Sequence, residues 1–195
     1  MANPGQVVII NGPSSAGKTS VVLEFCRRRA EAGQWWLPIS VDDFQIRTPP
    51  AFFAAPGLEG PYADQGFWLE PAGGGVTVVP GPGGRRLHQA FHRTVRVWAE
   101  QGFDVICDEA VFDQAAAQDW RVALEGLRCT WVALHCDLEV LEARERSRPD
   151  RVPGIARGLA SVVFSHIDPD LTLDSTTAGP EALADTLWSA LEAGA

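Results

Sequence analysis

A glycine-rich segment near the N-terminus holds the residue types best suited to binding phosphate. Residues 12–19 read Gly-Pro-Ser-Ser-Ala-Gly-Lys-Thr and fit the pattern G-x-x-x-x-G-K-S/T. In this pattern the backbone N–H groups of a tight loop surround the phosphates of a nucleotide, the lysine reaches the β- and γ-phosphates, and the next hydroxyl binds Mg²⁺. We call residues 12–19 the P-loop and predict that they bind a nucleotide together with the following serine. The predicted set is Gly12, Pro13, Ser14, Ser15, Ala16, Gly17, Lys18, Thr19 and Ser20.

Lys18 is the only lysine in the chain, which otherwise uses arginine for positive charge. A lysine ammonium is a compact, strongly hydrated point charge on a flexible stem, whereas the guanidinium group of arginine is a planar fork. We interpret this single lysine as a requirement of phosphate binding.

Acidic residues end three of the predicted strands. Asp42 and Asp43 follow the second strand, Asp108 and Glu109 end the third, and Asp137 follows the fourth. Phosphoryl transfer needs one carboxylate to accept the proton of an attacking hydroxyl and another to hold Mg²⁺, directly or through water. Asp42 suits the first role, although Asp43 stays open for it, and Asp108 suits the second. The alternative is that such acids cap helix N-termini, which we favour for Asp137.

Arginines cluster in the predicted helix of residues 137–148 and just after it. Arg144 and Arg148 are four positions apart and share one helix face, and Arg151 follows. Arginines beside a nucleotide offset the charge on a transferred phosphoryl group. We therefore expect a catalytic lid over residues 144–158. The alternative is a solvated helix face on which these arginines pair with neighbouring glutamates.

His88 and His92 lie four residues apart on a predicted helix and could together ligate a metal. The sequence around them lacks the H-E-x-x-H pattern of a zinc site. We expect a solvent-facing helix surface here instead.

Aromatic residues near the second strand and in the segment after it are candidates for an acceptor pocket. Phe44, Phe52, Phe53 and Trp68 could form the apolar walls of such a pocket beside Asp42 and Asp43. The aromatic residues of the insertion could equally form a small local core, and the sequence leaves both readings open.

Strands and helices alternate along the chain. The predicted strands are residues 6–10, 35–41, 103–110, 129–136 and 171–174. The predicted helices are residues 18–33, 85–102, 113–127, 137–148 and 179–195. This alternation indicates an α/β domain with a parallel sheet, helices on both faces and ligands at the carboxyl ends of the strands.

The chain length of 195 residues predicts one domain. Residues 48–84 are rich in glycine and proline and read as an insertion on the rim of the site, with a small hairpin formed by residues 66–70 and 76–79.

Composition limits the partners. The formal net charge of −9 argues against binding to nucleic acid or to an acidic membrane, because both need a basic surface. The four cysteines lack C-x-x-C spacing, so we expect buried, reduced thiols. The sequence shows neither a signal peptide nor a membrane span, which leads us to expect a cytoplasmic protein.

Five segments, taken in order, resemble the chloramphenicol phosphotransferases between about residue 6 and about residue 180. They are IINGPSSAGKTS, VDDF, DEAVFDQAAAQDWR, LHCDLEVLEARERSRPDRVPGIA and LDSTT. These proteins are P-loop kinases with a fold like that of the shikimate and nucleoside monophosphate kinases. The resemblance implies a five-stranded parallel sheet with the strand order 2-3-1-4-5.

The resemblance also implies an activity: ATP- and Mg²⁺-dependent phosphorylation of a hydroxyl on an aromatic antibiotic, such as the 3-hydroxyl of chloramphenicol, as a resistance mechanism. By position, Asp42 matches the catalytic aspartate of the family, and Asp108 matches the acid at the end of the third strand. The lid arginines match Arg144, Arg148 and Arg151. The loop of residues 174–177 lies where related kinases hold adenine, which assigns Ser175 and Thr176 to the nucleotide site. The departures, at His166 and in the rim insertion, bear on the acceptor.

Two other functions stay open. The chain could be a kinase for another small-molecule hydroxyl acceptor, such as a sugar, a nucleoside or a different antibiotic. The sequence does not decide whether it forms a homo-oligomer. It could also be a non-catalytic nucleotide-binding or regulatory module. A guanine switch is disfavoured, because its N/T-K-x-D motif needs a second lysine.

Overall fold

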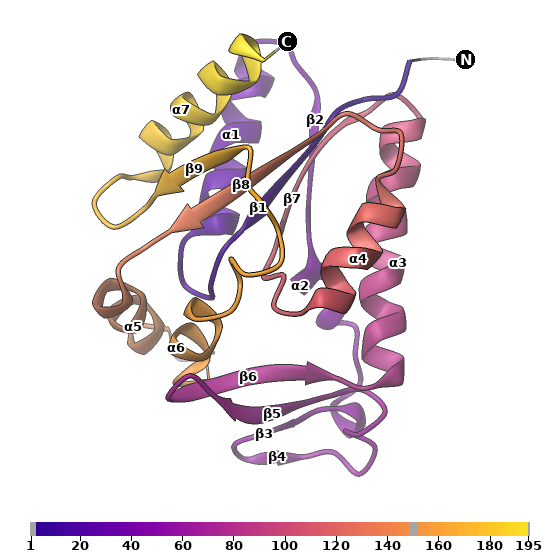
Figure 1. Cartoon of the computed structure of the whole chain (residues 1–195), viewed down its shortest axis with the longest axis vertical. Coiled ribbons are helices and arrows are strands. Elements are labelled where there is room, and N and C mark those ends of the chain that lie inside the picture. Colours follow the sequence, from indigo (N-terminus) through magenta and orange to yellow (C-terminus); the bar gives the residue numbers. More distant parts are fainter. Residues whose placement is uncertain (1–2, 149–151, 195) are drawn as a thin grey trace.

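The computed structural model describes residues 3–148 and 152–194, and its centre is a five-stranded parallel sheet (Figure 1). The strand order is β2-β7-β1-β8-β9, and every neighbouring pair is parallel. The strands are β1 (Val7–Asn11), β2 (Trp36–Ser40), β7 (Asp104–Glu109), β8 (Cys129–His135) and β9 (Leu171–Asp174). Counting only these strands, the order is 2-3-1-4-5, which confirms the expected topology.

Helices cover both faces of the sheet (Figure 1). Helices α1 (Lys18–Glu31) and α7 (Pro180–Ala193) lie on one face, and α3 (Pro82–Glu100) and α4 (Gln114–Ala123) lie on the other. Two shorter helices, α2 (Val41–Gln45) and α5 (Leu138–Arg146), follow the carboxyl ends of β2 and β8, and α6 (Ile155–Ala160) comes after α5. Within the described part of the chain, every helix is too short or too polar to cross a membrane.

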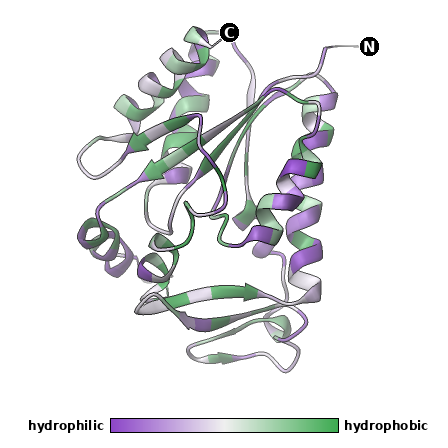
Figure 2. Cartoon of the chain, viewed as in Figure 1, coloured by the Kyte–Doolittle hydropathy of each residue, from purple (hydrophilic) through white to green (hydrophobic). Residues whose placement is uncertain are grey.

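Strand β1 is buried on both sides, as its continuous run of apolar residues predicts. Because successive side chains of a strand point to opposite faces, Val8 and Ile10 pack toward α1 and α7, whereas Val7 and Ile9 pack toward α3 and α4. Figure 2 shows hydrophobic residues running along the central strands. The two cores hold the P-loop rigidly at the carboxyl end of the middle strand.

The insertion forms a 3₁₀ turn and two small antiparallel sheets beside the carboxyl ends of the central strands (Figure 1). Its elements are η1 (Pro50–Phe52), β3 (Ala54–Ala55), β4 (Leu58–Glu59), β5 (Phe67–Ala72) and β6 (Gly75–Pro80). The pairing of β5 with β6 confirms the predicted hairpin. Strand β6 packs directly on α6, where a Cβ atom at Gly158 would lie 2.1 Å from the carbonyl oxygen of Val76. The hairpin and α6 therefore form one wall.

Candidate active site

The P-loop connects β1 to α1, and its two glycines meet different requirements. Gly17 has φ of 91°, in the left-handed region that glycine adopts without a steric penalty. Gly12 instead lacks space, because a Cβ atom there would lie 2.6 Å from the carbonyl oxygen of Leu134. Ser15 also has a positive φ, 64°. The loop thus turns tightly enough to direct backbone N–H groups toward an anion.

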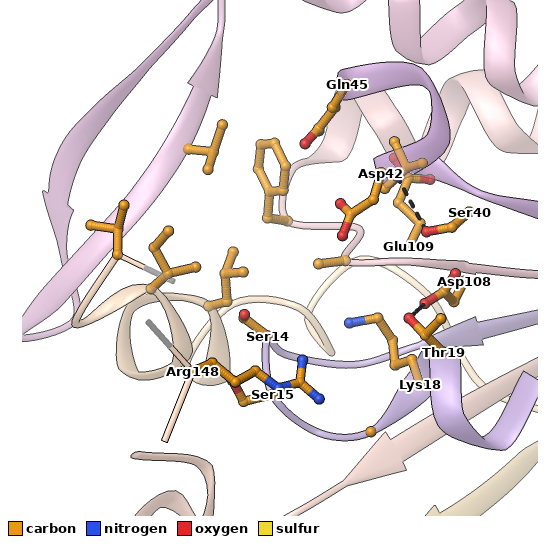
Figure 3. Close-up of a pocket in the computed structure, with 18 of the residues that line it drawn as sticks. Ser14, Ser15, Lys18, Thr19, Ser40, Asp42, Gln45, Asp108, Glu109 and Arg148 are labelled. Atoms are coloured by element: carbon orange, nitrogen blue, oxygen red, sulfur yellow. Dashed lines mark hydrogen bonds between the residues drawn. The ribbon is translucent and has the colours of Figure 1, made fainter. Parts of the chain in front are cut away.

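Lys18 crosses the P-loop. Its ammonium group donates hydrogen bonds to the carbonyl oxygens of Gly12, at 2.9 Å, and Pro13, at 3.0 Å. Figure 3 shows the ammonium group pointing into the cavity above the loop. The side chain therefore stabilises the loop and presents its charge where a phosphate would bind.

Thr19 and Asp108 join the start of α1 to β7. The Thr19 hydroxyl donates a 2.7 Å hydrogen bond to Asp108 Oδ2. Asp108 is only 4% exposed, and burial raises its pKa, while Lys18 and the Thr19 hydroxyl act in the opposite direction. Asp108 Oδ1 is buried without a hydrogen-bond partner among the described residues. A hydroxyl beside a carboxylate with a spare oxygen fits the oxygen ligands that Mg²⁺ prefers, directly or through water.

Asp42 and Asp43 separate at the start of α2. Ser40 is the N-cap of this helix, and its backbone N–H donates to Asp43 Oδ2 at 2.8 Å. The Asp43 carboxylate therefore caps its own helix, whereas Asp42 lines the cavity. The predicted strand of residues 35–41 was one residue too long at its end, because Val41 begins the helix. Of these two aspartates, only Asp42 lines the cavity.

A cavity of about 290 Å³ joins the P-loop to α2, the insertion and α6 (Figure 3). Its phosphate end is polar and is formed by Ser14, Ser15, Gly17, Lys18, Thr19, Ser20, Asp108 and Arg148. Its far end is mostly apolar and is formed by Phe53, Ala55, Leu69, Val78, Phe112, Val152, Ile155 and Leu159. Sequence reasoning identified Phe53 but missed the hairpin residues. The strands of the hairpin are short and alternating, and their sequence does not indicate which face lines the cavity.

Besides Asp43, three aromatic residues predicted to contact the acceptor lie outside this cavity. Phe44 packs into the core between the sheet and α3. Phe52 packs on Tyr62, with ring centroids 5.5 Å apart, and the Trp68 indole donates a 2.7 Å hydrogen bond to Glu70. These aromatic residues support the core and the insertion and do not line the cavity.

Arg144 and the loop after β9 support the P-loop through hydrogen bonds. The Arg144 guanidinium donates to the carbonyl oxygen of Ser175 at 2.8 Å, and the buried Ser175 hydroxyl donates to the carbonyl oxygen of Ala16 at 2.7 Å. Thr176 Oγ1 accepts a hydrogen bond from the backbone N–H of Asp137. Asp137 is the N-cap residue of α5, as predicted, yet its side chain makes no capping hydrogen bond. Arg144, Ser175 and Thr176 thus make contacts within the protein, and their nucleotide contacts stay predictions.

Arg148 lines the cavity close to Ser15 (Figure 3). Helix α5 ends at Arg146, two residues before its predicted end. Arg151 falls within residues 149–151, outside the described residues. The lid over residues 144–158 therefore stays a prediction.

Comparison with known proteins settles the family. Residues 5–192 match the family described as "Chloramphenicol phosphotransferase-like protein". The chain belongs to this family. It is 31% identical over 190 residues to "Putative O-phosphotransferase Rv2636" of Mycobacterium tuberculosis H37Rv, a match that covers 97% of this chain and 83% of the relative. The chloramphenicol phosphotransferase-like chain is accordingly a phosphotransferase with an alcohol group as acceptor.

Solved structures agree on the fold. The Mycobacterium tuberculosis APS kinase CysC, in complex with AMPPNP and APS, superposes with a TM-score of 0.67 at 18% identity and covers 97% of this chain and 98% of its own. A gluconokinase from Sinorhizobium meliloti superposes with a TM-score of 0.60 at 15% identity, and the match covers 99% of this chain and 94% of the gluconokinase. The Deinococcus radiodurans tunicamycin resistance protein superposes with a TM-score of 0.59 at 15% identity, and the match covers 96% of this chain and 95% of that protein. At these identities the likeness establishes a shared P-loop kinase fold.

This member of the phosphotransferase family buries both histidines of α3, so the predicted solvent-facing position of His88 and His92 is wrong. His92 is 1% exposed; its Nδ1 lies 2.6 Å from Asp119 Oδ2 and its Nε2 lies 3.1 Å from Glu109 Oε2. Burial opposes protonation of the ring, but the two carboxylates outweigh it and raise the pKa of His92. The sequence contained a sign of this burial, because His88 and His92 recur at helical spacing with the apolar residues Val95 and Ala99. All four are buried.

Glu109 completes this cluster and lines the cavity of the phosphotransferase. It is 2% exposed; burial favours its neutral form, yet His92 and the Trp120 indole lower its pKa. His88 lies between Glu109 and α2, with its Nε2 2.9 Å from Gln45 Nε2, and burial lowers the pKa of His88. Sequence reasoning noted Glu109 only as a strand-end acid and missed Gln45 and His88 as cavity residues.

Proposed function

We propose that the chain transfers the γ-phosphoryl group of ATP to a hydroxyl of a small molecule, and that chloramphenicol is the acceptor to test first. One observation carries the proposal: Asp42 and the P-loop residues Lys18 and Thr19 line the same cavity. A proton acceptor and a triphosphate site facing one space are what a direct transfer needs.

The phosphate end would hold the nucleotide. Backbone N–H groups of the P-loop and the Lys18 ammonium would bind the phosphates, and Arg148, with Arg151 outside the described residues, would offset their charge. Thr19 and Asp108 would hold Mg²⁺, Asp108 through water. When bound, Mg²⁺ supplies further neutralisation of the phosphate oxygens.

Asp42 would act at the acceptor. Its carboxylate would receive the proton as the acceptor oxygen bonds to the γ-phosphorus and the bond from that phosphorus to the ADP oxygen breaks. The apolar walls supplied by Phe53, Phe112 and Leu159 suit an acceptor with an aromatic body. Phosphorylation of chloramphenicol in the cytoplasm would make the chain an antibiotic-resistance enzyme.

A kinase for a sugar, a nucleoside or another antibiotic is the second candidate, because the polar residues Gln45 and His88 also face the acceptor end. A non-catalytic nucleotide-binding module is less well supported, since Asp42 would then have no chemical role in the cavity.

The test is a screen with radiolabelled ATP against hydroxylated antibiotics and metabolites, with chloramphenicol first and mass spectrometry of each product. We expect label in one acceptor and stimulation of ADP release by that acceptor alone, with Lys18→Ala as the inactive control. If no compound is labelled or stimulates ADP release, the proposed activity is wrong and a binding module takes its place.

A further inference from the structure

Asn11 is a polar residue at a core position, at the carboxyl end of β1 and directly before Gly12 of the P-loop. It follows the apolar run of residues 7–10 and is only 4% exposed. Because side chains alternate along a strand, Asn11 lies on the same face of the sheet as Val7 and Ile9, toward α3 and α4. A buried amide is costly unless its polar atoms have partners, so this asparagine needs a structural reason.

The Asn11 amide joins two segments that are remote in the sequence. Its Nδ2 donates a 2.6 Å hydrogen bond to the carbonyl oxygen of Val163, 152 residues away. Its Oδ1 accepts a 3.0 Å hydrogen bond from the backbone N–H of Val111, 100 residues away. Both valines are fully buried. An amide suits this position because one planar group donates to one segment and accepts from the other.

Both segments carry walls of the cavity. Val111 lies between Ala110 and Phe112, which line the cavity after β7. Val163 follows α6, and its backbone N–H donates at 3.1 Å to the carbonyl oxygen of Leu159, another residue that lines the cavity. The asparagine itself lies behind these walls, since it is not one of the residues that line the cavity.

The other end of α6 is held by a different residue. Glu145, on α5, is buried and accepts hydrogen bonds from the backbone N–H groups of Gly154, at 2.7 Å, and Ala156, at 2.8 Å. Loss of the bond from Asn11 to Val163 therefore loosens the exit of α6, whereas its entry stays bound to α5.

We propose that Asn11 is a positioning residue. Its amide fixes the loop after β7 and the segment after α6 relative to the P-loop, and so sets the distance between the phosphate end of the cavity and two of its apolar walls. This inference rests on the proposed function for the reaction that the positioning serves. Misplacement of bound reactants by about 1 Å can cost about 10²-fold in rate. Loss of the amide should therefore slow transfer between bound reactants and leave nucleotide affinity nearly unchanged.

The variant Asn11→Ala removes both hydrogen bonds. The matched control is Val7→Ala, which removes buried atoms from the same core at the other end of the same strand, away from the cavity. The variants and the wild type are compared at a temperature at which urea unfolding shows each protein to be fully folded. Under this condition a loss of global stability alone does not change the measured rates.

The first measurement is hydrogen exchange of backbone amides, without nucleotide or acceptor. The N–H of Val111 should exchange at least about tenfold faster in Asn11→Ala than in Val7→Ala, because its partner is gone. The N–H of Val163 should also exchange faster. That of Ala156, which is bonded to Glu145, should change little.

The second measurement is single-turnover transfer to the acceptor found in the screen, together with ATP titrations. We expect Asn11→Ala to lower the rate at saturating ATP and acceptor by about 10²-fold and to bind ATP as wild type does. Val7→Ala should transfer at close to the wild-type rate. If Asn11→Ala does not fold, Asn11→Ser takes its place. In the wild type, the side-chain amide protons of Asn11 should be protected from exchange and should open together with the N–H of Val111.

Three results would overturn the inference: exchange at Val111 that is no faster in a folded Asn11 variant than in Val7→Ala, equal losses of transfer rate in the two variants, or a loss in the Asn11 variant that lies mainly in ATP affinity. Unprotected side-chain amide protons of Asn11 in the wild type would overturn it as well. Hydrogen exchange needs no phosphoryl transfer, so it is separate from the fate of the proposed function. Local loosening in a chain that labels no acceptor would retain the positioning of the two segments and remove the kinase activity.

Discussion

The Thr19 hydroxyl donates a hydrogen bond to Asp108 at 2.7 Å, although the two residues are 89 positions apart. This contact brings the residue after Lys18 against the end of the strand that neighbours β1. It places a hydroxyl and a buried carboxylate together beside the phosphate loop, and oxygen groups of this kind are the ligands that Mg²⁺ prefers.

Replacement of Lys18 by alanine should reduce phosphoryl transfer by about 10²-fold or more, because a preorganised charge on the phosphates is lost. The rate is measured in single turnover with the acceptor found in the screen, and thermal unfolding checks that the fold is intact. Activity within about tenfold of wild type, about 1.4 kcal/mol in activation free energy, would contradict the role of Lys18.

Lys18→Arg should also be severely impaired, even though it keeps the charge. The forked guanidinium is bulkier than the ammonium group that reaches Gly12 and Pro13, and it is hydrated differently. The measurement is kcat at saturating ATP. A near-normal value would mean that the single lysine of the chain is not required by phosphate chemistry.

Asp42→Asn should cut transfer by about 10²-fold or more, the size of a lost general base, and leave nucleotide affinity nearly unchanged. Asp43→Asn is the matched control, because its carboxylate caps α2 at Ser40. It should lower the free energy of unfolding by about 1 kcal/mol and affect transfer much less. Greater loss of transfer in Asp43→Asn would move the proton acceptor to that residue.

Asp108→Asn should raise the Mg²⁺ concentration for half-maximal transfer by about tenfold or more, as residues that hold a metal through water commonly do. Transfer is measured across a magnesium titration, with EDTA abolishing it in both proteins. Glu125→Gln, an exposed change after α4, serves as the control. An unchanged magnesium requirement would remove Asp108 from the metal site.

His92→Gln should destabilise the protein in a pH-dependent way. The pKa of His92 is raised above its ordinary 6.5, so its stabilising contribution is complete below pH 6.5 and is lost as pH rises through the folded-state pKa. The pKa of Glu109 is lowered below 4.5, so its contribution is present above pH 4.5 and is lost as pH falls through its folded-state value.

Urea unfolding of wild type and His92→Gln should therefore differ most between pH 4.5 and 6.5, by about 2 kcal/mol or more, and the difference should become smaller at alkaline pH. His88 and Asp119, which face the His92 ring in the wild type, are present in both proteins. A difference that is constant with pH would show that His92 stabilises the fold only by packing.

Local sequence was sufficient for the phosphate loop and the strands of the parallel sheet, whereas the strand order came from the family resemblance. The P-loop is contiguous, and the positive φ of Gly17 comes from the turn between one strand and one helix. The β-branched run of β1 is buried on both faces and so could only be a central strand. These features needed no knowledge of distant contacts.

Tertiary structure alone decided which polar residues face the cavity. Asp43 became a helix cap because a five-residue helix starts where an extended strand was predicted, and so short a helix has no visible periodicity. His92 became buried because Glu109 and Asp119, 17 and 27 residues away, supply the two carboxylates that compensate its desolvation. Whether a polar side chain can be buried depends on partners brought from other elements, and a single stretch of sequence does not contain them.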